Sequence, residues 1–226
     1  MFNQYLKHSR TTILFVMMLG AFIIMSIFLP GKFLTLSNFQ SIASQIPEFG
    51  LLAIAIMLAM LTGGIDLSII STANLAGVGA ALMLTKYSLP QFGVYEESYL
   101  IFLAIVSAIS ISLLCGLING LLIAYIKVPA ILATLGTMSI FSGIAIVITK
   151  GYGIQGFPEK FLFIGSGTIL AIPMPMVIFI FCILLMSLIL NRTSFGFNLY
   201  MLGSNPVAAR FSGINNRGIL VRTYIL

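Results

Sequence analysis

Apolar residues fill this chain in long runs, and the polar residues that separate the runs are few. About 20 helical residues span a hydrocarbon core of about 30 Å, so each long apolar run predicts a membrane-crossing helix. Six such runs occur, over 11–29, 48–61, 66–85, 99–126, 129–149 and 173–190. The sequence therefore predicts an all-α fold: a polytopic bundle of transmembrane helices that forms a single domain over residues 1–226.

The second run, 48–61, is short for a crossing. The stretch before it, 37–47, mixes polar and apolar residues and starts at Ser37, a residue type that favours helix N-caps. We expect this stretch to form an interfacial or partly buried helix that leads into the crossing. Directly after the crossing, Gly63 and Gly64 permit a tight turn. The predicted bundle therefore contains a broken or short helix at this point.

Asp66 is a lone carboxylate in apolar surroundings. If the crossings alternate in direction, Asp66 lies at the cytoplasmic boundary, where it can cap a helix that starts at Leu67. A proton or sodium relay is the alternative, with Glu48 as the second carboxylate near bilayer depth. Relays usually need a chain of titratable groups, so capping is the preferred interpretation.

Composition and charge support the membrane assignment and orient it. The chain is 60% hydrophobic and 7% charged, whereas a soluble domain carries about a quarter charged residues. All the arginines fall on the side of the amino terminus and the loop 191–218, and the positive-inside rule makes this side cytoplasmic. The same rule accounts for the net charge of +6, so no nucleic-acid partner is needed.

No motif in the sequence indicates catalysis, a cofactor or a metal. The run GYGIQG, residues 151–156, matches a dinucleotide-binding pattern, but it follows a membrane span instead of a strand. No P-loop pattern occurs, and Cys115 and Cys182 lie in apolar segments without metal-ligand spacing. We therefore expect no catalytic residue, no cofactor and no metal site in this chain.

Four polar side chains lie within predicted crossings: Asn74, Asn119, Thr134 and Thr137. Such groups must find partners in a bilayer. Helix-to-helix hydrogen bonding is the preferred interpretation, and contact with a transported solute is the alternative. Gly116 and Gly120 form a GxxxG pair beside Asn119, which is typical of close helix packing.

A predicted docking segment follows the last crossing on the cytoplasmic side. It comprises Gly203, Asn205, Pro206, Ala208, Ala209, Arg210, Ser212 and Gly213. The Asn-Pro pair predicts a helix start and the last glycine a helix stop. The two alanines and the serine lie at helical spacings and would leave a smooth ridge that can enter a groove on another protein, with the arginine at its rim. The alternative is an ordinary loop helix packed on its own bundle.

Three segments together resemble, in order and spacing, the permeases of ribose-type sugar ABC importers, a family that includes xylose, galactoside and autoinducer-2 permeases. The segments are LTGGIDLS, GLINGLLIAYIKVPAILATLGTMSIFSGIAIVIT and GSNPVAARFSGI. The resemblance implies a multi-pass protein of the bacterial inner membrane that works as a homo- or heterodimer. It also implies a cytoplasmic ATPase that docks on the third segment through a coupling helix, and an extracytoplasmic solute-binding protein.

Members of this family continue through further spans, whereas this chain stops at RTYIL. We therefore expect the sequence to be a C-terminally truncated fragment. The leading hypothesis is a permease subunit for a monosaccharide or similar small polar solute. It is not itself an enzyme, because ATP hydrolysis is expected on the partner. An ion-coupled secondary transporter is the alternative, because it would share the composition and the broken helices.

Overall fold

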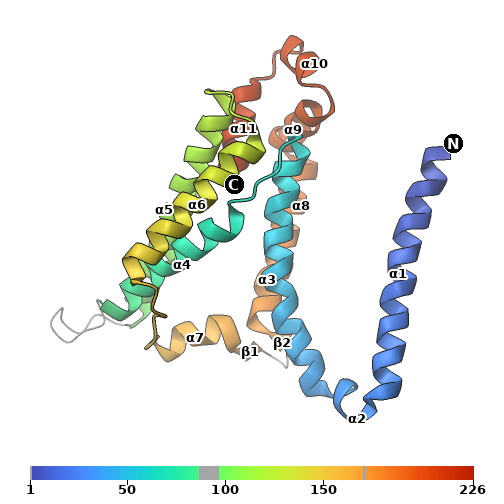
Figure 1. Cartoon of the computed structure of the whole chain (residues 1–226), viewed down its shortest axis with the longest axis vertical. Helices are drawn as coiled ribbons and strands as arrows, with labels where there is room; N and C mark the ends of the chain where they lie inside the picture. The colour runs from blue at the N-terminus through green and yellow to red at the C-terminus, as the bar shows by residue number, and fades with distance from the viewer. Residues whose placement is uncertain (1, 87–96, 170–171) are drawn as a thin grey trace.

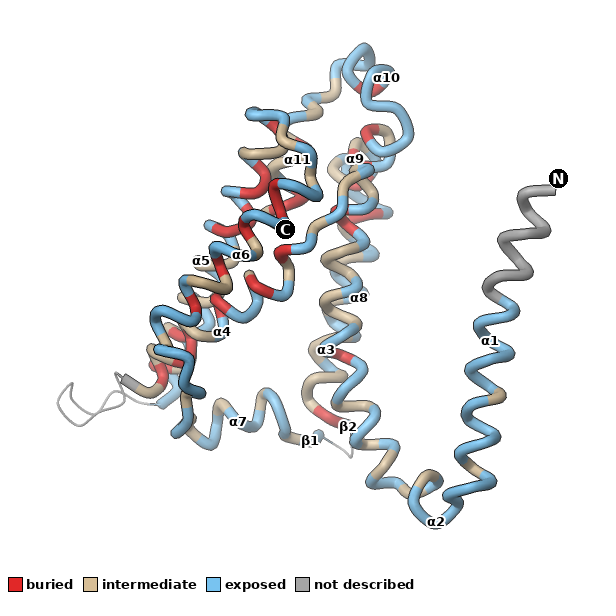
Figure 2. The backbone as a smooth tube through the Cα atoms, in the orientation of Figure 1, coloured by how far each residue is buried: buried red, intermediate tan, exposed pale blue. Residues whose placement is uncertain are grey.

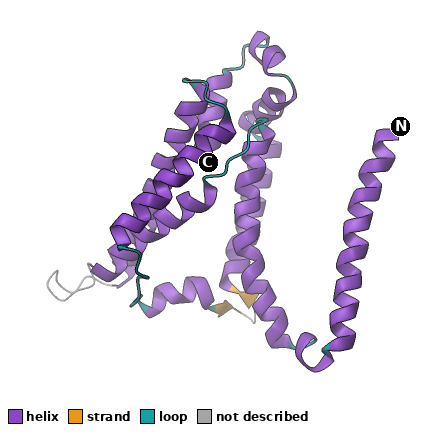
Figure 3. Ribbon diagram, viewed as in Figure 1, coloured by secondary structure: helices purple, strands orange, loops and turns teal. Residues whose placement is uncertain are grey.

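The computed structural model describes residues 2–86, 97–169 and 172–226, with side chains from Thr12 onward. Helices make up nearly all of this part of the chain (Figure 3). They are α1 (Phe2–Phe28), α2 (Pro30–Phe33), α3 (Leu36–Leu61), α4 (Ile69–Lys86), α5 (Glu97–Ala124), α6 (Ala130–Thr149), α7 (Glu159–Ser166), α8 (Met174–Arg192), α9 (Ser194–Ser204), α10 (Pro206–Phe211) and α11 (Asn216–Ile225). Two short strands, β1 (Thr168–Ile169) and β2 (Ile172–Pro173), pair antiparallel. The predicted all-α class is confirmed.

Four helices are long and apolar enough to cross a membrane, judged by length and composition: α3, α5, α6 and α8. Two further apolar stretches, Thr12–Phe28 and Ile69–Thr85, are shorter. In Figure 1, α1, α3, α4, α5, α6 and α8 run alternately down and up the molecule. The amino terminus therefore lies at the same end as α9 and α10. Following the arginine distribution, we refer to this end as the cytoplasmic end and to the opposite one as the outer end.

The stretch 37–47 is helical and leads into the crossing, as predicted, and α3 runs unbroken through both. Its N-cap is Thr35, whose hydroxyl accepts a hydrogen bond from the backbone N–H of Asn38 at 3.3 Å. Pro47 lies inside α3 and is buried. A proline removes one helical hydrogen bond, but apolar helices of membrane proteins tolerate it where neighbouring elements pack around the freed carbonyl. The polar residues before Pro47 therefore mark the first turns of a long helix.

The buried apolar residues form three clusters, and Figure 2 colours the buried positions red. One core lies at the cytoplasmic end and joins α3, α8, α9 and α11 through Leu58, Leu190, Leu199, Leu202 and Ile219. A second joins α4, α5 and α6 around Leu75, Cys115 and Phe141, and a third joins α4 to α5 around Leu84 and Ala104. In contrast, the described apolar side chains of α1 are mostly exposed. In a bilayer such exposed apolar surface is expected to face the lipid, because lipid tails are as apolar as the side chains.

The orientation can be tested by cysteine labelling in a variant that lacks Cys115 and Cys182. Gln155→Cys, in the exposed segment after α6, should react in intact cells with a membrane-impermeant thiol reagent. Ser212→Cys, which replaces an exposed side chain beside α10, should react only after the membrane is made permeable. Labelling of Ser212→Cys in intact cells would contradict the assignment of the cytoplasmic end.

Candidate functional site

An irregular link over residues 62–68 joins α3 to α4. α3 ends at Leu61, Gly63 adopts a φ of +82°, and α4 begins only at Ile69. The predicted break at Gly63 and Gly64 is therefore confirmed, and a turn forms at Thr62 and Gly63, whose N–H groups donate to the carbonyls of Ala59 and Met60 at 3.0 Å. The expected helix start at Leu67 is wrong. The link is extended and passes between the cytoplasmic end of α3 and the start of α4 (Figure 1). Its backbone groups cannot pair within a helix, so they need partners from other elements.

Asp66 provides one partner from within the link itself. Its carboxylate oxygen Oδ1 accepts hydrogen bonds from the backbone N–H of Ser68 at 2.8 Å and from the Ser68 hydroxyl at 2.7 Å. The backbone carbonyl of Ser68 in turn accepts from the N–H of Thr72 at 2.8 Å, so Ser68 occupies the N-cap position of α4. Asp66 therefore stabilises the turn before the helix instead of capping the helix itself, which corrects the predicted geometry.

A chain of buried hydrogen bonds continues from Ser68 into α5 and α6. The Ser68 hydroxyl gives its only hydrogen to Asp66, so it accepts from the amide Nδ2 of Asn119 at 2.7 Å. The Oδ1 of Asn119 accepts from the Thr137 hydroxyl at 2.7 Å. Ser68 and Asn119 are each only 1% exposed, and Thr137 is 4% exposed. We call Asp66, Ser68, Asn119 and Thr137 the polar chain; it fixes the link to both neighbouring helices.

Thr134 of α6 also forms a hydrogen bond to the link. Its hydroxyl is fully buried and accepts a hydrogen bond from the backbone N–H of Leu67 at 3.2 Å. Its own hydrogen can go to the carbonyl of Ala130 at 2.8 Å, within α6. The contacts of Thr134, like those of Asn119 and Thr137, are the helix-packing interactions that we preferred from the sequence. The sequence analysis missed Ser68, although its place two residues after an aspartate is typical of an Asx turn.

α11 packs against the link and α5 where only glycine fits. A Cβ atom on Gly116 would overlap the backbone carbonyl of Tyr224, and one on Gly120 would lie 2.9 Å from the Cα of Val221. A Cβ atom on Gly64 would lie 2.8 Å from the Tyr224 hydroxyl oxygen. The predicted close packing at the GxxxG pair is therefore confirmed, and its partner is α11, which the sequence did not identify.

The predicted start and stop of the docking helix, now α10, are confirmed. The side chain of Asn205 accepts hydrogen bonds from the backbone N–H groups of Val207 and Ala208, both at 3.0 Å, and Pro206 opens the helix. At the other end Gly213 has a φ of +82°. Its N–H donates to the carbonyl of Arg210 at 3.1 Å, and the N–H of the next residue donates to Ala209 at 3.0 Å, which is a Schellman motif.

The predicted ridge of small residues on α10 is wrong in one respect, because Ala209 is fully buried. Ala208 and Ser212 are exposed, but the most prominent side chains are Val207, 64% exposed, and Phe211, 89% exposed. The side-chain amide of Asn216 at the start of α11 donates to the carbonyl of Pro206 at 2.7 Å. This bond holds α10 against the bundle with Ala209 inward, an orientation that the spacing alone did not determine.

α9, which precedes α10 in the chain, packs against the start of the link. Its Gly203 lies so close to the end of α3 that a Cβ atom there would overlap the backbone carbonyl of Leu61. Leu61 is the last residue before the link, so α9 and α11 both contact its surroundings. The loop predicted over 191–218 is thus largely helical, and its glycine serves packing within the bundle.

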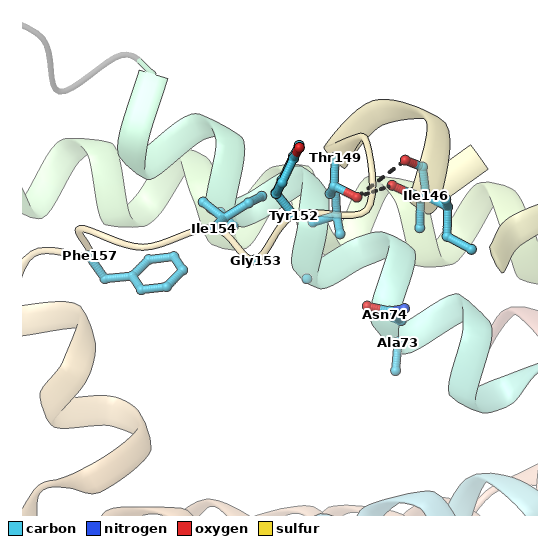
Figure 4. A pocket seen from close by; sticks show the side chains of 12 residues that line it. Ala73, Asn74, Ile146, Thr149, Tyr152, Gly153, Ile154 and Phe157 are labelled. Carbon is cyan, nitrogen blue, oxygen red and sulfur yellow. Dashed lines mark hydrogen bonds between the residues drawn. The ribbon is translucent and has the colours of Figure 1, made fainter. Parts of the chain in front are cut away.

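Asn74 differs from the other polar residues of the crossings. Its side chain is exposed and makes no hydrogen bond to any residue that the structure describes. It faces a hollow of about 470 Å³ between α4, the end of α6 and the segment that follows α6 (Figure 4). Among the described residues, no group of three or more histidine, cysteine, aspartate or glutamate side chains could hold a metal ion.

Substitution of Asn119 tests the polar chain. Asn119→Leu keeps the volume but removes both side-chain bonds, so the free energy of unfolding should fall by about 1 kcal/mol. Combined with Thr137→Val, the two losses should not add, because both break the same bond. Denaturant unfolding in detergent measures this, with Ser139→Ala as the control, since Ser139 is exposed and bonds only within α6. Additive losses would contradict the pairing.

Two substitutions of Asp66 distinguish a structural role of this carboxylate from a charge-dependent role. Asp66→Asn keeps an oxygen that accepts from Ser68, so folded yield and transport should stay near those of the parent protein. Asp66→Leu removes the acceptor and should lower the free energy of unfolding by about 1–3 kcal/mol. Folded yield in detergent and uptake in vesicles are the measurements. A well-folded Asp66→Asn protein without transport would support the relay instead.

Comparison with known proteins adds an independent finding. The profile of a protein family described as "branched-chain amino acid transport system / permease component" matches residues 38–226. Among curated proteins, the chain is similar to autoinducer 2 import system permease proteins from three bacteria. It is 33% identical over 181 residues to that of Enterobacter sp., 34% over 183 to that of Yersinia enterocolitica, and 32% over 183 to that of Escherichia coli K12.

These matches cover 77–78% of this chain but 52% of each relative. The chain therefore spans about half the length of the curated relatives that it matches. No solved structure matches it significantly.

These findings confirm the resemblance to importer permeases that the three sequence segments indicated, and they do not favour an ion-coupled transporter. With the four long apolar helices, they indicate a multi-pass protein of the bacterial inner membrane. The chain belongs to the family of branched-chain amino acid transport system permease components.

Proposed function

We propose that this chain is part of the membrane permease subunit of an ATP-driven ABC importer for a monosaccharide or a similar small polar solute. The observation that carries the proposal is α10, a capped helix at the cytoplasmic end that presents exposed apolar side chains and is bonded to the bundle. Family membership and the relatives named as autoinducer 2 import permeases support it. ATP hydrolysis takes place on a separate cytoplasmic ATPase subunit.

The exposed surface of α10 is suited to a groove on that ATPase. Val207 and Phe211 are four residues apart and therefore project from the same side of the helix. Arg210 is exposed beside them and adds a positive charge. An amphipathic helix that inserts apolar anchors into a groove is a common docking mode, and a central aromatic side chain often contributes most of the affinity.

Contacts inside the bundle can transmit movement of α10 to the link. α10 is bonded to α11 through Asn216, and α11 packs on α5 at Gly116 and Gly120. α9 rests on the last residue of α3 through Gly203. Close-packed contacts of this kind transmit displacement because they contain no voids that could absorb it. We propose that docking and ATP hydrolysis move α9 to α11 together and thereby reposition the link.

The complete importer needs further partners. We propose a second permease subunit, identical or related, because the solute pathway would lie between two permeases, and an extracytoplasmic solute-binding protein at the outer end. The lipid bilayer covers the remaining apolar surface. The ion-coupled alternative has little support in the described residues, since Asp66 is engaged by Ser68 and Glu48 is exposed on α3.

A single substitution on α10 tests docking. Phe211→Ser removes the most exposed anchor without opening a core, so the protein should insert and fold normally. We expect co-purification with the ATPase and ATP-driven uptake to fall at least tenfold, in line with the loss of an aromatic hot spot. Phe163 is a half-exposed side chain on α7 at the outer end, so Phe163→Ser is the matched control and should leave ATPase association unchanged.

Ala209→Glu provides a contrasting control, because Ala209 is fully buried. That substitution should lower folded yield, whereas Phe211→Ser should not. Normal ATPase association by a well-folded Phe211→Ser protein would show that α10 is not the docking element.

A further inference from the structure

We propose that the hollow beside the middle of α4 and the end of α6 is a binding subsite for the transported solute, with Asn74 as the polar side chain that contacts it. The inference rests on the proposed transport function and deepens it by assigning the solute a site within this chain. Its volume of about 470 Å³ lies within the range of small-molecule sites. Its lining extends from the middle of α4 to the last residues of α6 and the segment after them. In Figure 1, α6 runs to the end of the molecule opposite α10, where a solute from outside would arrive.

The shape of the hollow comes from small residues on one side of α4. Ala73, Gly77 and Ala81 follow one another at four-residue spacing and line it. A Cβ atom on Gly77 would meet no other heavy atom within 4 Å, so the space beside it is open. In contrast, a Cβ atom on Gly79, two residues further along α4, would clash with Ile111 of α5. α4 therefore packs closely on one side and leaves room on the other.

Asn74 supplies the polar group of the site. Its amide offers two donors and one acceptor, and none of them bonds to a described residue. Asn119 provides the comparison, since it is the same residue type in a neighbouring helix and both ends of its amide are bonded. Because Asn74 is exposed to the hollow, its amide can bond to a molecule that enters it. A hydroxyl group is a suitable partner because it can both donate and accept.

The side of the hollow opposite α4 is formed by the end of α6 and the segment after it, and Thr149 and the turn after α6 position this segment. The Thr149 hydroxyl donates to the carbonyl of Ala145 at 2.9 Å and can accept from the N–H of Gly151 at 3.3 Å. Lys150 and Gly151 both have positive φ, at 54° and 75°. This turn brings the following segment alongside α4, as Figure 4 shows for the labelled residues Tyr152, Gly153, Ile154 and Phe157.

The uncharged lining of the hollow favours a neutral solute, as in the proposed function. None of the described side chains that line the hollow is charged, so an ionic solute would lose its hydration without gaining a counter-charge. Tyr152 and Phe157 add aromatic surface to the lining. Aromatic surface and a neutral amide together suit a molecule with hydroxyls on one side and C–H groups on the other, as in a neutral sugar.

The test fills the hollow in the full-length transporter, reconstituted with its ATPase and binding protein in lipid vesicles. Gly77→Leu places a side chain in the open space and should reduce uptake of autoinducer 2 or D-ribose at least tenfold, while ATPase co-purification is retained. Gly136→Leu is the matched control, because Gly136 also has open space beside it on α6 but does not line the hollow. It should transport normally.

Two further measurements keep the inference testable if Gly77→Leu folds poorly. Asn74→Leu should raise the KM for uptake about tenfold, whereas Asn74→Gln should recover part of the loss. Gly77→Cys should react with an external thiol reagent, and the solute should slow this reaction.

Normal uptake by a well-folded Gly77→Leu protein, an unchanged KM for Asn74→Leu, or no protection of Gly77→Cys would overturn the subsite. Uptake of neither probe by a parent protein that still binds its ATPase would overturn the assigned solute class. A parent protein that does not bind an ATPase would instead contradict the proposed function, and the inference with it.

Discussion

The hydrogen bonds that satisfy the extended link between α3 and α4 are the constraint on which the rest of the structure depends. Irregular backbone within a membrane protein is stable only where other protein groups or a water-filled cavity satisfy it. Here the polar chain from Asp66 to Thr137 and the hydroxyl of Thr134 provide those partners. Because these partners come from α5 and α6, the link fixes both helices relative to α4. The three helices therefore form one packed unit.

Close backbone contacts extend this unit to the cytoplasmic end. α11 lies on Gly116 and Gly120 of α5, and its Tyr224 lies against Gly64 of the link. α9 lies against the end of α3 at Gly203. In an apolar environment helices associate through such close packing and a few hydrogen bonds, because there is no hydrophobic driving force between them. The same contacts that stabilise the fold can therefore relay movement from α10 to the link.

The distribution of satisfied and unsatisfied polar groups separates structure from proposed function. Asn119, Thr134 and Thr137 are buried and bonded, so their polarity is accounted for within the bundle. Asn74 is exposed to a hollow and has no partner among the described residues. Sequence reasoning placed all four in one class because each is a polar residue in an apolar run. Only the three-dimensional arrangement shows that one of them differs.

The sequence by itself determined the all-α class, the apolar helices, the break at Gly63 and Gly64, and both ends of α10. These features depend on local properties: hydropathy over about 20 residues, glycine conformations, and caps formed by near neighbours. It did not determine that α3 continues through Pro47, that Ala209 faces inward, or that α11 packs on α5. Such outcomes depend on contacts between residues far apart in the chain. Tertiary packing alone decided them, because only it brings those residues together.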